Sequence, residues 1–291
     1  PDILGVELSE GSARLAIVAG DGGSAPLLRT VSWTDLLDAV PRLRAAMADL
    51  PPDVQMAVSV HGRKMRSRLI DLPTLKKSDI DLALTSRLRK YLPYRTDDWS
   101  LFPREARVAT LDPERRAYFV TIAATAGIKD VVRIMEPFAA RWVSRQLELP
   151  ARSLQRWLQW ERPAISTGVH VAAHFLDSHV LMWACSEGTL IMARRIEWTA
   201  SDETLGDETA LRGLVSQMRA TVAWLRFRTL TCEIAPQDLY LSGQHAAHPA
   251  LVGAVTRDFD LPVIALDAPR LHPSGAEVAY GLSLASIEEK G

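Results

Sequence analysis

Residues 238–244 read Asp-Leu-Tyr-Leu-Ser-Gly-Gln, an apolar strand that ends in two small residues. A helical stretch from His248 to Phe259 follows, and then a second short strand, Leu-Pro-Val-Ile, at 261–264. Because glycine has no Cβ, the backbone at Gly243 can approach another group closely, including a flat ligand. This strand, turn, helix and strand predict a ligand-binding corner in an α/β fold.

A β unit also opens the chain. Residues 3–18, ILGVELSEGSARLAIV, read as strand, tight turn and strand. A second β-rich opening lies at 169–196, with a hairpin turn at 186–188, and each opening precedes helices. This duplication of the element order predicts an α/β protein with two lobes.

Hydrophobic periodicity predicts the elements between these units. We expect strands at 54–60, 64–70 and 116–124, a short strand or turn at 154–160, and helices at 78–91 (with Ser78 as N-cap), 128–146, 211–228 and 276–287.

Composition limits the function classes. The chain has 291 residues, of which 47 % are apolar, so two cores can form, and the formal net charge of -1 gives no electrostatic argument for nucleic acid. No run approaches the roughly 18 apolar residues of a membrane span, and no signal peptide is visible. Cys185 and Cys232 lack metal or redox spacing, and we expect free, buried thiols. These features predict a soluble cytoplasmic protein.

Two proline motifs carry a family resemblance. They are Leu-Ile-Asp-Leu-Pro at 69–73 and, after a helix, Lys-Tyr-Leu-Pro-Tyr at 90–94. Together with Tyr-Leu-Ser-Gly at 240–243 and Ala-Tyr-Gly-Leu at 279–282, they make the chain resemble PilM, the actin-like protein of type IV pilus assembly. The chain is also similar to the cytoplasmic region of GspL from type II secretion. The resemblance covers nearly the whole chain.

The resemblance implies an actin-like, ribonuclease H-like α/β fold of two lobes. Lobe I would comprise 1–165 and the closing helix at 275–291, with a small α+β subdomain inserted at about 72–133. Lobe II would comprise 166–274 and carry the adenine-binding corner.

The resemblance also implies partners. The first is the cytoplasmic N-terminal segment of a PilN-type bitopic membrane protein, bound between the first lobe and the inserted subdomain. The second is the pilus or secretion motor ATPase. The chain would then serve as a cytoplasmic scaffold of an inner-membrane platform, held there by partners or by a span beyond Gly291. The expected partner-binding residues are Leu72, Pro73, Leu92, Pro93 and Tyr94.

Actin-like ATPases bind phosphates at two hairpins, and the first departs from the family pattern here. The family has Asp-x-Gly, then small residues and Lys. In this chain Glu7 stands for the Asp, Ser9 for the Gly and Arg14 for the Lys, while Gly11 and Ser12 keep the turn small. Glutamate is one methylene longer, and Ser9 restricts the backbone.

The second hairpin and the adenine corner depart further. His174 falls where the Asp is expected and Leu176 where the Gly is expected. A register that uses Asp177 does not restore Asp-x-Gly. At the corner, Gly243-Gln244 replaces the usual pair of glycines.

Three functions remain open. A pseudo-ATPase scaffold, with no catalytic residue, no metal and at most weak Mg-ATP binding, is favoured. The alternative is an active Mg-ATP-binding ATPase of the same fold, with Glu7 in place of Asp. A sugar-kinase-like enzyme needs a general-base Asp that no motif supplies. His170, His174 and His179 have poor spacing for zinc, and we expect them to be structural.

Overall fold

The computed structural model describes residues 3–9, 11–17, 27–51, 54–60, 65–89, 98–106, 108, 112–176, 178–199, 201–228, 235–266 and 277–284. The chain forms two compact units. Unit 1 comprises 1–65, 124–163 and 269–291, and unit 2 comprises 66–123 and 164–268. The segment expected as an insertion, about 72–133, therefore divides at residue 123, and its first part groups with unit 2.

Unit 1 contains a five-stranded sheet in the order β3-β2-β1-β4-β8. The strands are β1 (Ile3–Ser9), β2 (Ser12–Ile17), β3 (Leu27–Ser32), β4 (Gln55–Val60) and β8 (Trp142–Glu148). β1, β2 and β3 pair antiparallel, whereas β4 lies parallel to both β1 and β8. The hairpin expected at 3–18 is confirmed, and its turn contains Gly11 at φ 79°.

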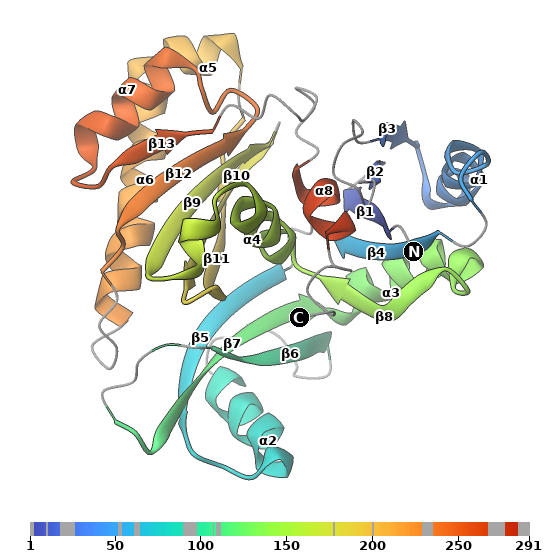
Figure 1. Ribbon diagram of the computed structural model, residues 1–291, viewed down its shortest axis with the longest axis horizontal. Coiled ribbons are helices and arrows are strands. Elements are labelled where there is room, and N and C mark those ends of the chain that lie inside the picture. The colour runs from blue at the N-terminus through green and yellow to red at the C-terminus, as the bar shows by residue number, and fades with distance from the viewer. Residues whose placement is uncertain are drawn as a thin grey trace. The chain divides into compact units, whose positions relative to one another are not determined.

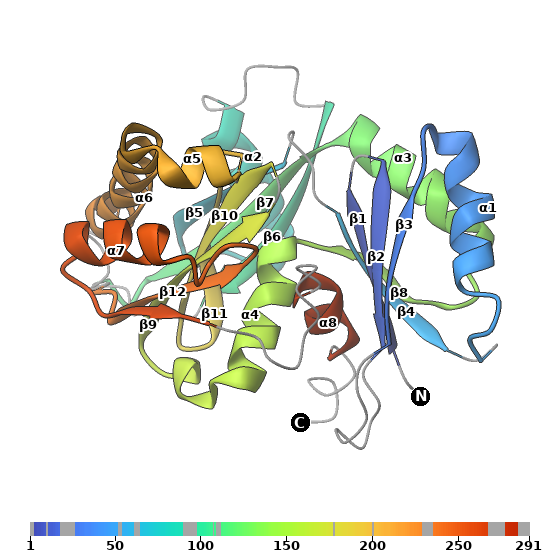
Figure 2. The ribbon, with the colours of Figure 1, turned by 90° about the horizontal axis from the view of Figure 1, so that it is seen from above.

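Helices cover both faces of this sheet (Figure 2). They are α1 (Leu36–Ala46), α3 (Thr125–Met135), α4 (Pro150–Glu161) and α8 (Glu277–Ser283). Leu4, Val6 and Leu8 alternate along β1 and pack into one apolar core with residues of α1 and α3. The other face of β1 carries Gly5 and Glu7, and α8 and α4 lie on that side (Figure 2).

Two glycines allow α8 to pack closely in unit 1. A Cβ on Gly5 would overlap the carbonyl oxygen of Ala279 in α8. A Cβ on Gly281 would overlap the carbonyl oxygen of Ser153 in α4. The backbone of α8 is therefore in direct contact with both β1 and α4, which a side chain at either position would prevent.

Unit 2 repeats the sheet topology of unit 1. Its order is β11-β10-β9-β12-β13, with antiparallel pairing among β9, β10 and β11 and parallel pairing of β12 with β9 and β13. The strands are β9 (Val169–Leu176), β10 (His179–Ser186), β11 (Thr189–Glu197), β12 (Asp238–Gly243) and β13 (Val263–Ala265). This repetition confirms the duplication expected from the two β-rich openings.

The helices that accompany the five-stranded sheet of unit 2 are α5 (Asp202–Gly206), α6 (Glu208–Arg228) and α7 (Pro249–Asp258). α6 and α7 lie on the same side of the sheet (Figure 1). The strand, turn, helix and strand expected at 238–264 are therefore confirmed.

Unit 2 also contains a smaller sheet in the order β5-β7-β6. Its elements are β5 (Met65–Pro73), α2 (Lys77–Leu88), β6 (Trp99–Ala106) and β7 (Arg115–Ala124). Leu84 and Leu88 of α2 pack against Tyr118, Val120 and Ile122 of β7. Ser67 of β5 binds the edge strand β11, because its hydroxyl donates to Ala193 O (2.5 Å) and accepts from Ala193 N (3.1 Å).

Three local expectations are wrong. The N-cap of α2 is Lys76 rather than Ser78. α3 ends at Met135, because Pro137 in the following 3-10 helix (Glu136–Phe138) cannot donate the next helical hydrogen bond, and the chain continues as β8. Residues 154–160 are helical, because Leu154, Trp157 and Leu158 recur at i, i+3 and i+4 and are buried.

Two further observations concern cysteines and membrane spans. Cys185 is a buried thiol, as expected, and Cys232 lies outside the described residues. Within the described ranges, no helix combines the length and apolarity needed to cross a bilayer. Residues 276 and 285–287 of the expected closing helix also lie outside the described part.

The close packing of α8 predicts how two glycine substitutions differ. Gly281→Ala should destabilise the protein by about 1–3 kcal/mol, because the added methyl overlaps backbone that cannot move freely. Gly213→Ala in α6 is the matched control, since a Cβ there meets nothing within 4 Å, and it should stabilise by about 0.5–1 kcal/mol. Urea unfolding followed by circular dichroism measures both, and equal effects would contradict the packing.

Candidate functional site

The β1–β2 hairpin holds a buried ion pair. Glu7 and Arg14 are direct partners in the antiparallel register, and Arg14 Nη1 lies 3.5 Å from Glu7 Oε1. The Glu7 side chain is fully buried, and that of Arg14 is 17 % exposed. At the tip Ser9 pairs with Ser12, both half-buried, and the only left-handed residue of the described turn is Gly11. The residues expected to replace Asp and Lys of a phosphate loop thus lie beside one another.

Three polar residues line up across the parallel strands of unit 1. Glu7 of β1 is in register with Ser59 of β4, and Ser59 is in register with Glu148 of β8. All three lie near the carboxyl ends of their strands, the edge at which α/β sheets commonly bind ligands. The Ser59 hydroxyl donates to the backbone carbonyl of Glu148 at 3.0 Å, so the neighbouring strand ends are also hydrogen-bonded.

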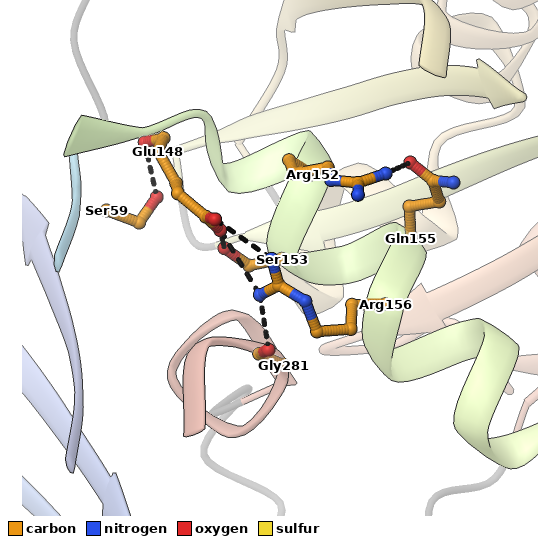
Figure 3. Close-up of polar contacts among 7 residues, drawn as sticks. All are labelled: Ser59, Glu148, Arg152, Ser153, Gln155, Arg156 and Gly281. Carbon is orange, nitrogen blue, oxygen red and sulfur yellow. Dashed lines mark hydrogen bonds and ion pairs between the residues drawn. The ribbon is translucent and has the colours of Figure 1, made fainter. Parts of the chain in front are cut away.

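Arg156 of α4 binds the carboxylate of Glu148 through two nitrogens (Figure 3). Nη2 lies 2.9 Å from Oε1, and Nη1 lies 3.2 Å from Oε2. Nη1 also donates to the carbonyl of Gly281 in α8 at 2.8 Å, and the Ser153 hydroxyl donates to Glu148 Oε2 at 3.4 Å. Arg156 is only 6 % exposed, so this is a buried, charge-assisted contact that connects β8, α4 and α8.

We call Arg14, Glu7, Ser59, Glu148 and Arg156 the carboxylate row. Carboxylate oxygens at strand ends are ligands that Mg²⁺ prefers, so the row is where unit 1 could hold such an ion. The geometry does not fit that role, because both oxygens of Glu148 accept from Arg156 and Glu7 lies beside Arg14. Each carboxylate already has a cation.

The corner of unit 2 is closed by packing of the protein on itself. His174 of β9 is fully buried, in register with Ser242 of β12, and its Nδ1 lies 3.1 Å from Ser242 Oγ. Gly243 has φ 86°, and a Cβ there would overlap the carbonyl oxygen of Phe175. The backbone N–H of Gln244 donates to the same carbonyl at 2.9 Å. The contact between β9 and β12 therefore requires Gly243 without any ligand.

His170 lies at the other end of β9 and is buried between two acceptors. Nδ1 is 2.7 Å from Asp238 Oδ1, and Nε2 is 2.7 Å from the carbonyl oxygen of Thr167. Since neither acceptor can donate, both ring nitrogens donate only when the imidazole is protonated. Burial lowers the pKa of His170, but the hydrogen bonds to Asp238 and Thr167 and the charges of Asp238 and Glu187 outweigh it and raise the pKa overall.

The three histidines considered for metal binding each have a protein contact. His170 and His174 have those described above, and His179 Nδ1 lies 3.2 Å from Ser178 Oγ. Within the described residues, no three or more His, Cys, Asp and Glu side chains are grouped so that they could hold a metal ion.

The expected partner-binding residues lie in different environments. Leu72 is 2 % exposed and belongs to the core of the smaller sheet. Pro73 is exposed at the end of β5. Leu92, Pro93 and Tyr94 lie outside the described residues.

Local sequence patterns do not identify Ser59, Glu148 or Arg156 as site residues. A helix over 128–146 would leave Glu148 in a connecting segment, whereas Glu148 is the last residue of β8. A signal was present, because Glu148-Leu149-Pro150 repeats the acidic-Leu-Pro pattern of Asp71-Leu72-Pro73, which ends β5. A strand or turn at 154–160 would not direct Arg156 toward Glu148, whereas helix α4 does.

Comparisons with known proteins identify the fold. No family model and no curated protein matches the chain. The PilM–PilN type IV pilus biogenesis complex contains a similar chain, with TM-score 0.76 and 14 % identity over 99 % of each chain. A Bacteroides thetaiotaomicron protein of actin-like ATPase fold and unknown function gives 0.55, with 8 % identity over 98 % of this chain and 96 % of that one.

A third similar structure is the cytoplasmic domain of EpsL, an inner-membrane component of the type II secretion system of Vibrio cholerae. It gives TM-score 0.54 and 11 % identity over 98 % of this chain and 95 % of that one. The chain therefore has the actin-like fold, as expected, and its fold is similar to those of the chain in the PilM–PilN complex and of the EpsL cytoplasmic domain.

The environment of His170 predicts the pH dependence of stability. A raised pKa in the folded state means that the contribution of His170 is complete below its ordinary pKa of 6.5 and is lost as pH rises through the raised pKa. His170→Gln should therefore lower the melting temperature most at about pH 5.5 and least at about pH 9. His245→Asn is the control, because this exposed residue has φ 60°, which Asn tolerates. If the melting temperatures of His170→Gln and the unsubstituted protein differed by the same amount at every pH, His170 would not titrate as described.

Proposed function

We propose that this chain is an actin-like scaffold of a type IV pilus or type II secretion platform. In this proposal it binds the cytoplasmic segment of a PilN-type membrane protein and reaches the inner membrane through that partner. The observation that carries the proposal is the similarity to the chain in the PilM–PilN complex, which extends over 99 % of both chains. We also propose that this chain contacts the motor ATPase of the same platform.

The smaller sheet is the part of unit 2 that we propose to carry the partner. Among the described residues, large apolar side chains are exposed here at Leu82 of α2 (75 %) and Phe102 of β6 (46 %), and Pro73 is exposed at the end of β5. β6 is the last strand in the order β5-β7-β6, so its outer side has no strand partner within this sheet. The outer edge of β6, with Phe102 exposed on that strand, suits recognition of a short extended peptide.

The site chemistry supports a scaffold over an enzyme. Glu7 and Glu148 lie beside arginines, and the Gly243 backbone is in close contact with the carbonyl oxygen of Phe175 of the same unit. We propose that the nucleotide site is degenerate and that the protein is a pseudo-ATPase. These contacts support that proposal because the groups that would hold a metal and a base are engaged within the protein.

The alternative is an active Mg-ATP-binding ATPase of the same fold. The observation that favours it is the pair of carboxylates, Glu7 and Glu148, at the ends of parallel strands. The two candidates differ in nucleotide binding, since a ligand that binds the folded state must raise the melting temperature. We expect no shift with millimolar Mg-ATP. A saturable rise would show nucleotide binding, and release of phosphate from ATP by the same protein would establish the alternative.

Partner binding can be tested by calorimetry. The cytoplasmic segment of the PilN-type protein from the same genome should bind this chain. Phe102→Ser should weaken binding about tenfold or more (about 1.4 kcal/mol), because it removes an apolar contact at the proposed surface. Leu37→Ser, at an 88 % exposed position on α1, should leave the affinity unchanged. The absence of binding to the unsubstituted chain, both by calorimetry and by pull-down, would overturn the proposal.

A further inference from the structure

The carboxylate row combines two negative and two positive side chains in one unit. The negative charges belong to Glu7 and Glu148, which flank Ser59 across parallel strands. Arg14 reaches Glu7 from β2, and Arg156 reaches Glu148 from α4. The exposed fraction is 0 % for Glu7, 16 % for Glu148 and 6 % for Arg156, so these charges are largely withdrawn from water.

A buried carboxylate needs a compensating cation. An isolated charge removed from water is strongly unfavourable, so buried carboxylates are paired with a basic side chain or bind a metal. In this row the bidentate contact of Arg156, with nitrogen–oxygen distances of 2.9 and 3.2 Å, supplies a planar cation that matches both carboxylate oxygens. Mg²⁺ would need those oxygens at about 2.0–2.1 Å in an octahedral arrangement. The guanidinium and the ion would therefore compete for the same oxygens.

We infer that Arg14 and Arg156 take the place of a divalent cation at the carboxylate row, so that unit 1 is held together there without metal. Arg156 is the main replacement for the cation. It also donates to Gly281 O and thereby fixes the position of α8. Arg14 completes the charge balance at Glu7. This inference rests on the part of the proposed function in which the nucleotide site is degenerate, and it does not depend on the partner.

The inference predicts that removal of the arginine creates a cation requirement. Arg156→Met keeps most of the apolar length of the side chain but leaves Glu148 without its bidentate partner. The variant should melt several degrees below the unsubstituted protein, and millimolar Mg²⁺ or Mn²⁺ should restore part of that loss in a saturable way. The unsubstituted protein should show no response to Mg²⁺, Mn²⁺ or EDTA at matched ionic strength.

A double variant is the matched control. Glu148→Gln with Arg156→Met removes both charges, so its melting temperature should not respond to divalent cations. Titration with Mn²⁺ followed by electron paramagnetic resonance measures cation binding directly, because the signal of free Mn²⁺ decreases when the ion binds. Arg156→Met should bind Mn²⁺, whereas the unsubstituted protein and the double variant should not.

The same measurements can be made at the other end of the row. Arg14→Met serves if Arg156→Met does not fold, because Arg14 is more exposed and its loss disturbs the packing less. Two results would overturn the inference: Mn²⁺ binding by the unsubstituted protein, or arginine variants that fold but gain no cation dependence. The cation measurements contain neither peptide nor nucleotide, so a negative result there does not affect the proposed partner binding. In the same way, failure of the peptide to bind does not affect the inference about the arginines.

Discussion

The contact between Arg156 and Glu148 is the interaction on which the organisation of unit 1 depends. One guanidinium binds the end of β8 through two carboxylate oxygens and the backbone of α8 through the Gly281 carbonyl. The glycines at positions 5 and 281 bring α8 close enough for that contact. The sheet (through β8), α4 and α8 are thus joined at one buried ion pair. Loss of either Arg156 or Glu148 would leave the charge of the other uncompensated.

The two units share a topology but treat the corresponding position differently. In unit 1 the first strand carries Glu7 beside Ser59 of the adjacent parallel strand, and in unit 2 it carries His174 beside Ser242. Across the antiparallel neighbour, Glu7 faces Arg14 and His174 faces Leu181. Each unit therefore places its strand-end polar group against residues of its own, an ion pair with Arg14 in unit 1 and a hydrogen bond to Ser242 in unit 2.

Local patterns predicted the hairpins, the glycine corner and the repeated order of elements, because strand alternation and turn glycines act over short distances. They failed at β8, where pairing with β4 makes the segment a strand. They failed at α4 because the helical spacing of Leu154, Trp157 and Leu158 was not given enough weight. The candidate site was predicted in part. Glu7 and Arg14 were identified, but their pairing with each other, and the alignment of Glu7 with Ser59 and Glu148, depend on register between distant segments that no local pattern contains.

A crystal structure of the protein grown with Mg²⁺ and a non-hydrolysable ATP analogue would show whether arginines or a divalent cation neutralise Glu7 and Glu148. We expect Arg156 still to bind Glu148 through both nitrogens and Arg14 to remain beside Glu7, with no ordered triphosphate or Mg²⁺ at the carboxylate row. An ordered Mg²⁺ bound through Glu7 or Glu148, with the arginines turned away toward phosphate oxygens, would contradict it.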